Sequence, residues 1–365
     1  MAYSGTQGTQ GTQGTQGTQG TQGTQGTQGT QGTQGTQGTQ GAGGSSGPYL
    51  SLALATTRDG IARHWTGAGG QVPDRPTPGG WDGFRRMQDG PQAAVLDYEL
   101  GALAGLDLSQ PQAGAVTSPV TGGAAVVNLT RPVFDQAFVD AQMALMRSYA
   151  DLRIDRMAEI QVQTGDFLSF FGAQAYLDRV ATKRTLDLIG ALLRMMGRLE
   201  MRLKLHFDFP RPVTVSDEMQ PMIQTPGHGA WPSGHATEAF AVAVLFSALK
   251  AGSGIDALAE VQARSQPMRL AARIATNRTI AGVHYPSDSM AGAVLGIGTA
   301  ELLTNWLSGA TATPARAFNG TAFLEDFTLD TLESVLPATG MIAFTAPPPP
   351  LLADLWQIAR DEWVR

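Results

Sequence analysis

The spacing of apolar residues predicts helices over most of the chain after residue 130. Phe134, Phe138 and Leu145 recur on one helical face, and Thr130 followed by Pro132 has the composition of an N-cap and first turn. Further helices are predicted over 173–207, 233–249, 267–281 and 286–307, and the chain ends in a short amphipathic stretch over 351–363. The fold class is therefore predicted to be all-α, a helical bundle with long functional loops.

Changes in composition predict four segments. These are a low-complexity tail and linker over 1–47, a mixed region of loops and short helices over 48–130, a helical catalytic core over 131–310, and an irregular C-terminal tail over 311–365. In the first, the triplet Gly-Thr-Gln repeats twelve times from Gly5 to Gln40. Glycine at every third position is the collagen requirement, but these triplets lack proline. A flexible polar tail and a triple helix, which would make the protein a homotrimer, both stay open.

The composition of the chain limits the kinds of binding partner and chemistry that we expect. The net charge of −6 gives no global basic field that would attract nucleic acid or anionic lipid, so we expect a small-molecule substrate. The chain contains no cysteine, which excludes disulfide bonds, catalysis by a thiolate and metal sites with thiolate ligands. We find neither a signal peptide nor an apolar run long enough to span a membrane, and therefore expect a soluble protein.

A turn that could bind an anion precedes the predicted helix at 233. In Pro232-Ser233-Gly234-His235, serine is a preferred N-cap, and the residues after it place free N–H groups at the positive end of a helix. Gly234 would let the backbone approach an anion closely. An ordinary capped helix start is the alternative interpretation.

Three cations and a histidine–carboxylate pair accompany this turn. Lys204 and Arg211 would supply a point charge and a planar fork, although either could be a surface charge. Arg278 lies in an otherwise small and apolar helix, where a bound anion would be its partner. Asp288 could hold the proton of one ring nitrogen of His284 and leave the other free, or the pair could simply cap the last long helix.

Taken in order, these blocks resemble the signature of the type 2 phosphatidic acid phosphatase (PAP2) and vanadium haloperoxidase superfamily. The matching blocks are Lys204-x6-Arg211-Pro212, Pro232-Ser233-Gly234-His235 and Arg278-x5-His284-x3-Asp288. The resemblance covers residues 204–288 and departs at Asn277, where the family usually has serine. It implies a helical bundle of the family's type.

The resemblance also implies a role for each residue. Lys204, Arg211 and Arg278 would bind the non-bridging oxygens of the anion, together with Ser233 and the Gly234 N–H. His235 would be the general acid or base, and Asp288 would orient His284. His284 itself would be the phosphatase nucleophile or the ligand of vanadate.

Two chemistries and one non-enzymatic role follow. The large helical body, and His228 seven residues before His235 as in bromoperoxidase-type members, favour a vanadate-dependent haloperoxidase that oxidises halide with peroxide. The alternative is a PAP2-type acid phosphatase, without a cofactor, that acts on phosphomonoesters or pyrophosphates through a phosphohistidine. The second alternative is an inactive domain in a structural or surface protein with a collagen-like repeat.

Overall fold

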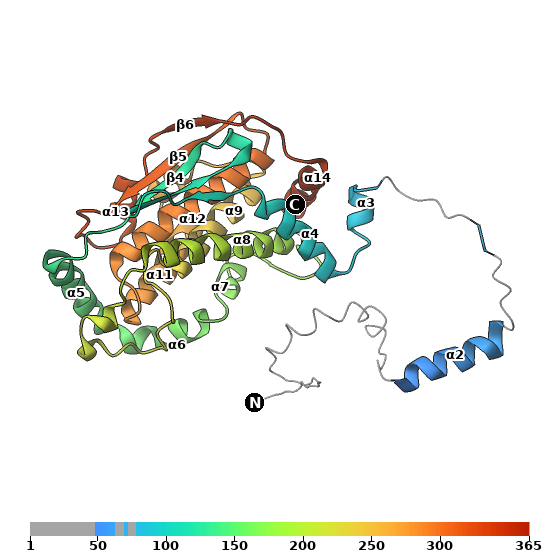
Figure 1. The fold of residues 1–365 in the computed structure, drawn as a ribbon, viewed down its shortest axis with the longest axis horizontal. Helices are drawn as coiled ribbons and strands as arrows, with labels where there is room; N and C mark the ends of the chain where they lie inside the picture. The colour runs from blue at the N-terminus through green and yellow to red at the C-terminus, as the bar shows by residue number, and fades with distance from the viewer. Residues whose placement is uncertain (1–47, 63–68, 72–77, 365) are drawn as a thin grey trace. The chain divides into compact units, whose positions relative to one another are not determined.

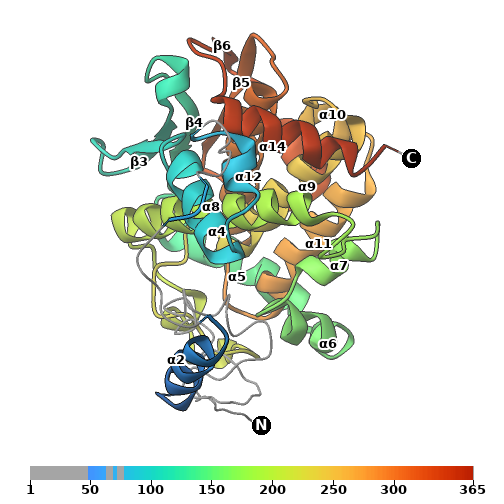
Figure 2. The ribbon, with the colours of Figure 1, turned by 90° about the vertical axis from the view of Figure 1, so that its right-hand side faces the viewer.

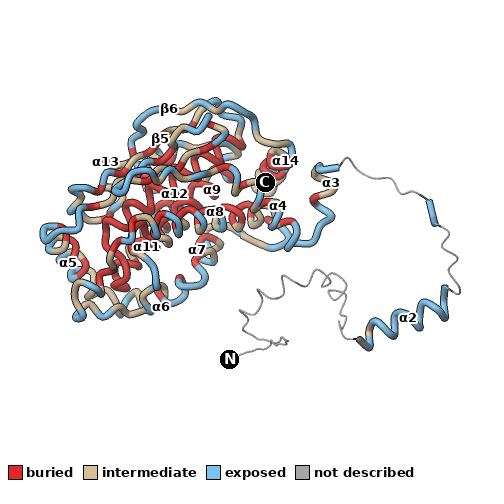
Figure 3. Tube along the Cα trace, in the orientation of Figure 1, coloured by how far each residue is buried: buried red, intermediate tan, exposed pale blue. Residues whose placement is uncertain are grey.

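The computed structural model describes residues 48–62, 69–71 and 78–364 (Figure 1). The Gly-Thr-Gln repeat and its linker, residues 1–47, lie outside these residues, so the predicted tail and trimer are not tested. The chain divides into two compact units, one ending at Gln92 and one beginning at Ala93. In the first unit, helices α2 (Pro48–Ala62) and α3 (Trp81–Phe84) precede the start of α4 (Asp89–Gly101). Helix α2 exposes almost all of its side chains (Figure 3).

The second unit is mostly helical, and its core is built around two apolar helices, α9 (Gly234–Ala251) and α12 (Pro286–Leu307). Every residue of α12 is buried, and most of α9 is buried as well (Figure 3). A helix that is apolar all round needs neighbours on every side. The surrounding helices are α5 (Gln136–Ala150), α6 (Arg153–Gln163), α7 (Leu168–Gly172), α8 (Lys183–Phe207), α10 (Ala257–Gln262), α11 (Gln266–Ile280), α13 (Leu329–Val335) and α14 (Pro350–Asp361).

Glycines let α12 pack directly on the backbone of α9. A Cβ on Gly292 would lie 2.5 Å from the Ser233 carbonyl oxygen, and one on Gly296 would overlap the Thr237 carbonyl oxygen. This close packing fixes the N-terminal ends of the two helices relative to each other. None of the helices described combines the length and the apolar character that a membrane span requires.

A five-stranded sheet accompanies the helices, so the prediction of an all-α fold was wrong in this respect. The strands are β2 (Gly105–Asp107), β3 (Ala113–Thr117), β4 (Ala125–Thr130), β5 (Ala312–Asn319) and β6 (Gly340–Ala343), in that spatial order. Strands β4 and β5 are parallel and the other pairs are antiparallel. Figures 1 and 2 show the strands gathered over one side of the helices, where β4 and β5 contact α12. There Arg316 of β5 donates to both carboxylate oxygens of Glu301, at 2.8 and 2.7 Å.

The composition and pairing of β5 explain why the sheet was not predicted from the sequence. It contains Pro314, which has no N–H to donate and normally excludes a residue from a paired strand. Residues 312–315 pair only with β6, and residues 316–319 pair only with β4. At Pro314, β5 therefore has a partner strand on one side only. The backbone N–H that proline lacks leaves no carbonyl oxygen of a neighbouring strand without a donor.

Several predicted boundaries need correction. Thr130 does not cap a helix, because it ends β4, and α5 begins at Gln136 with the Asp135 side chain as its cap. The helix predicted from residue 173 begins only at Lys183, since Asp178 accepts from the N–H groups of two following residues in a turn. The tail over 311–365 is not irregular, because it contains β5, α13, β6 and α14.

Candidate active site

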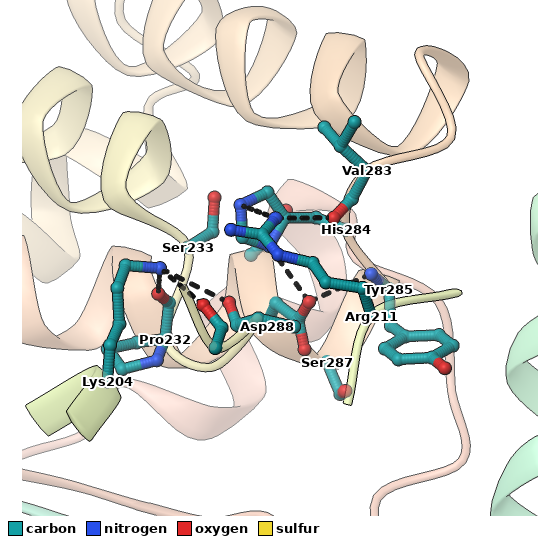
Figure 4. A network of polar contacts seen from close by, with 12 residues as sticks. Lys204, Arg211, Pro232, Ser233, Val283, His284, Tyr285, Ser287 and Asp288 are labelled. Atoms are coloured by element: carbon teal, nitrogen blue, oxygen red, sulfur yellow. Dashed lines mark hydrogen bonds and ion pairs between the residues drawn. The ribbon is translucent and has the colours of Figure 1, made fainter. Parts of the chain in front are cut away.

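Figure 4 shows that several of the predicted site residues lie close together in the second unit, namely Lys204, Arg211, Ser233, His284 and Asp288. Lys204 lies one turn before the end of α8, Arg211 follows that helix, and Ser233 directly precedes α9. His284 and Asp288 flank the start of α12. The close packing of α9 on α12 keeps the last three of these residues together.

Lys204 is 1% exposed, and its ammonium group is directed at the main chain of the loop before α9. Its Nζ donates to the carbonyl oxygen of Pro232 at 2.6 Å and to those of Gly229 and Ala230 at 3.3 and 3.4 Å. Burial lowers the pKa of Lys204 to about 8. The residue therefore holds the turn in shape and places a positive charge beside it.

The hydrogen bonds of His284 determine which ring nitrogen carries its proton. Arg211 Nη1 lies 3.1 Å from Nε2, and Asp288 Oδ2 lies 2.9 Å from Nδ1. Because a guanidinium can only donate, Nε2 must be the acceptor and Nδ1–H must donate to the carboxylate. Burial first, and then Arg211 and Lys204, lower the pKa of His284 well below its usual value. The ring is thus neutral, with the lone pair on Nε2.

Arg211 is held by its neighbours on three sides. Nη1 also donates to the Val283 carbonyl oxygen at 2.7 Å, Nε donates to the His228 carbonyl oxygen at 3.0 Å, and Nη2 lies 3.1 Å from His228 Nδ1. The structure therefore places His228 at the exposed edge of the site, in contact with Arg211 and without a contact to His284 among the described residues. The fork of Arg211 is aimed so that one nitrogen reaches the His284 lone pair.

Arg278 and Ser233 contribute donors that have no acceptor. Arg278 is 1% exposed, and its Nη2 donates to the Ile160 carbonyl oxygen and to Gln163 Oε1, both at 3.3 Å. Its Nε and Nη1, and the Ser233 hydroxyl, are buried and have no hydrogen-bond partner among the described residues. Buried donors without a partner cost about 1–3 kcal/mol each. An oxyanion in this position would satisfy all three.

His235 approaches the same region from the first turn of α9. Its Nε2–H donates to the Gln163 carbonyl oxygen at 2.8 Å, which leaves Nδ1 free in the neutral ring. Burial, with Arg278 as the second cause, lowers the pKa of His235 to about 4. A Cβ at position 234 would overlap the Glu200 carboxylate, so glycine there lets the start of α9 approach this side chain closely.

Three polar residues of this region were not predicted. Glu200 lies one turn before Lys204, and Glu238 lies one turn after Gly234, so the i, i+4 spacing could have indicated both. Burial raises the pKa of Glu200 to about 7 and that of Glu238 to about 8, the second also through repulsion by Glu200. Gln163, on α6, has no such signal.

This set of groups can bind a small tetrahedral oxyanion and present a nucleophile to it. The cations Lys204, Arg211 and Arg278 all act on His284, as the lowering of its pKa shows. An anion among them would offset their mutual repulsion and would accept from the unpartnered donors.

Comparison with known proteins finds a family that matches part of the chain. The PAP2 superfamily model matches residues 186–312, which include every residue predicted for the site. No curated protein matches the chain. Among solved structures, the chain is similar to the first transmembrane PAP2-type phosphatidylglycerolphosphate phosphatase from Bacillus subtilis, with 18% identity over 48% of this chain and 86% of that one. The TM-score is 0.33.

Proposed function

Since residues 186–312 form a PAP2 superfamily domain, we propose that the protein is a phosphatase that acts on phosphomonoesters or pyrophosphates through a phosphohistidine. The observation that carries the proposal is the state of His284. Its Nε2 has a lone pair, at 3.1 Å from Arg211 Nη1, in a buried region where Arg278 Nε and Nη1 and the Ser233 hydroxyl lack acceptors. A nucleophile beside preorganised donors is the arrangement that phosphoryl transfer requires.

The phosphoryl group of the substrate takes the place of the missing acceptors. Its non-bridging oxygens accept from Arg278 Nε and Nη1 and from the Ser233 hydroxyl. The Gly234 N–H, at the first position of α9, has no partner inside the helix and adds a main-chain donor. Arg211 turns Nη1 from the His284 lone pair to an oxygen, which frees the nucleophile as the substrate binds.

Hydrolysis then proceeds in two steps. The His284 Nε2 lone pair attacks phosphorus, the N–P bond forms, and the P–O bond to the leaving group breaks as its oxygen takes a proton from His235 Nδ1. In the second step water attacks phosphorus and gives a proton to His235 Nδ1. The N–P bond breaks, its electron pair returns to Nε2, and phosphate leaves. Asp288 accepts from Nδ1–H throughout and stabilises the positive charge that develops on the ring.

The protonation of His235 implies activity on the acid side of neutrality. Its pKa of about 4 means that the free protein carries a proton on Nδ1 only at low pH. As pH rises through that value the proton is lost, and kcat/KM should fall. A bound phosphoryl dianion opposes the effect of Arg278 and raises the pKa of His235 in the complex.

Vanadate fits the same donors, with His284 Nε2 as its ligand and Arg278 and Ser233 on its oxygens. When bound, it would supply the activation of peroxide for halide oxidation. The matching family model is described as the PAP2 superfamily, and halide oxidation is favoured only by the sequence resemblance that includes His228. Vanadate dependence, haloperoxidase activity and the structural role of the repeat therefore stay predictions.

The first experiment tests the nucleophile. Wild type, His284→Ala and His206→Ala are assayed with p-nitrophenyl phosphate, and a phosphoryl adduct is trapped by alkaline quench and located by mass spectrometry. His206 is a matched control, because its Nε2 contacts the Gln110 and Ala113 carbonyl oxygens instead of the site. We expect turnover and an adduct in wild type and in His206→Ala only. Full activity in His284→Ala would refute the proposal, and bromination of a phenol dye with vanadate and peroxide, without ester hydrolysis, would favour the haloperoxidase.

The second experiment tests the acid. For phenyl phosphate, whose leaving group needs a proton, His235→Ala should lower kcat/KM, which reports the phosphorylation step alone, about 10²- to 10⁴-fold. For p-nitrophenyl phosphate the loss should be much smaller, because p-nitrophenolate leaves without protonation. Equal losses on the two esters would mean that His235 does not protonate the leaving group.

A further inference from the structure

We propose that Gln163, which lies outside the matched residues 186–312, is a positioning residue that holds both Arg278 and His235 for the phosphoryl group. The inference rests on the proposed function. It also explains why this chain has Asn277 where the family usually has serine.

The side chain of Gln163 joins α6 to α11. The residue is 1% exposed, and its Oε1 accepts from Asn277 Nδ2 at 2.9 Å and from Arg278 Nη2 at 3.3 Å. Both neighbours are donors, which identifies the shared atom as the amide oxygen. A serine at 277 would end one atom after Cβ and could not extend an amide to Gln163. Asn277 is itself held by Arg156, whose Nη1 donates to Asn277 Oδ1 at 2.7 Å.

The main chain of the same residue holds His235. Gln163 is the last residue of α6, and its carbonyl has no partner inside the helix. It accepts from His235 Nε2–H at 2.8 Å, and the Ile160 carbonyl, one turn earlier, accepts from Arg278. The negative end of the α6 dipole thus faces both groups and favours their positive forms. The bond to Nε2 also leaves Nδ1 as the nitrogen that exchanges a proton with the substrate.

The neutral amide matters as much as its position. A carboxylate at 163 would pair with Arg278 and offset the charge that should attract the phosphoryl group. The amide orients Arg278 without neutralising it. Gln163 Nε2 is buried and has no partner among the described residues, so this donor belongs to the same unsatisfied set as Arg278 Nε and Nη1.

The test compares Gln163→Leu and Gln163→Glu with wild type and with Gln161→Leu. Gln161 is exposed on the same helix and serves as the matched control. The readouts are kcat and KM for p-nitrophenyl phosphate, the inhibition constant of inorganic phosphate, the pH profile of kcat/KM, and the rise in melting temperature with phosphate. Gln163→Leu should weaken phosphate binding about tenfold to a hundredfold, because Arg278 loses an orienting acceptor.

Gln163→Glu separates positioning from a merely structural role. It keeps the acceptor but adds a negative charge, so phosphate should bind more weakly than in wild type. The same charge raises the pKa of His235, so the decline of kcat/KM should move to higher pH. If Gln163→Leu does not fold, the results for Gln163→Glu alone show whether Gln163 positions Arg278 and His235.

The outcomes distinguish this inference from the proposed function. Wild-type hydrolysis together with an unchanged inhibition constant and an unchanged pH profile in Gln163→Glu overturns the role of Gln163 only. A wild type that neither hydrolyses the ester nor gains stability from phosphate overturns both. A loss as large in Gln161→Leu as in Gln163→Leu would show that α6 acts through general stability, and would also overturn the inference.

Discussion

Replacing Arg278 by methionine should stabilise the protein in phosphate-free buffer and make it insensitive to phosphate. Arg278 is buried, and no carboxylate lies within ion-pair distance of it among the residues that the structure describes. Burial accordingly lowers the pKa of Arg278 to about 10. In the free protein this side chain is therefore a source of instability, which an anion relieves.

The magnitude follows from the hydrogen bonds. Two unpartnered donors, Nε and Nη1, cost about 1–3 kcal/mol each, and Arg278→Met removes both. The substitution leaves the Ile160 carbonyl without its donor, at a cost of about 1–3 kcal/mol, whereas Gln163 Oε1 keeps Asn277. Methionine fills a similar volume, so cavity effects are small. The free energy of unfolding should rise by about 1–3 kcal/mol.

Phosphate should offset most or all of this difference in stability. At about a hundredfold excess over its Kd, a ligand stabilises the folded protein by about 2.7 kcal/mol. Wild type should gain this increment, and Arg278→Met should gain almost none, because two charge-assisted hydrogen bonds are worth about 3–6 kcal/mol. Urea unfolding with and without phosphate, followed by tryptophan fluorescence, measures both effects.

Arg273→Met is the matched control for this experiment. Arg273 lies on the same helix, is exposed, and pairs with Glu159 at 2.6 and 2.7 Å. It should keep the full phosphate increment. If Arg278→Met loses stability without phosphate and still gains the full increment when phosphate is added, Arg278 does not belong to an anion site.

Two further predictions concern the charge and the packing of the site. Because the pKa of Lys204 is lowered to about 8, its ammonium group loses its proton above that value. Calorimetry should therefore show that the affinity for phosphate falls from about pH 7 to about pH 9. An affinity that does not change over this range would contradict a role of Lys204 in binding. Gly296→Ala should destabilise the protein by about 1–3 kcal/mol or more, since its methyl group would overlap the Thr237 carbonyl oxygen. Gly197→Ala, in open space on α8, should be neutral or stabilising by about 0.5–1 kcal/mol, and equal effects of the two substitutions on urea unfolding would refute the packing argument.

Three of the helices that carry the site, α9, α11 and α12, could be predicted because each has its own boundary signal. Ser233 and Gly252 delimit α9, and prolines 267 and 286 stand in the first turns of α11 and α12. Their predicted limits agree with the structure to within about two residues. The proximity of Lys204, Arg211, His284 and Asp288 was also predictable, but only through the resemblance, because these residues lie far apart in sequence.

The rest depended on tertiary contacts that leave no local pattern. Strand β5 pairs differently along its two halves, which no rule of alternation anticipates. Thr130 and Pro132 have the composition of a helix start, yet Thr130 pairs with Asn319 in the sheet. Gln163 reaches the site across more than a hundred residues of sequence, and a glutamine at the end of an amphipathic helix is otherwise unremarkable.

The anchoring of the site by main-chain oxygens has a consequence for how the protein can be altered. Lys204, Arg211, Arg278 and His235 are each fixed by carbonyl groups, and every amino acid supplies a carbonyl. Side chains at the anchoring positions, such as Ile160 and Val283, can therefore be exchanged for others of similar size while the reactive groups keep their orientation. A library that varies these positions would change the packing of the hydrophobic cluster to which both residues belong, while the polar contacts of the reactive groups stay in place.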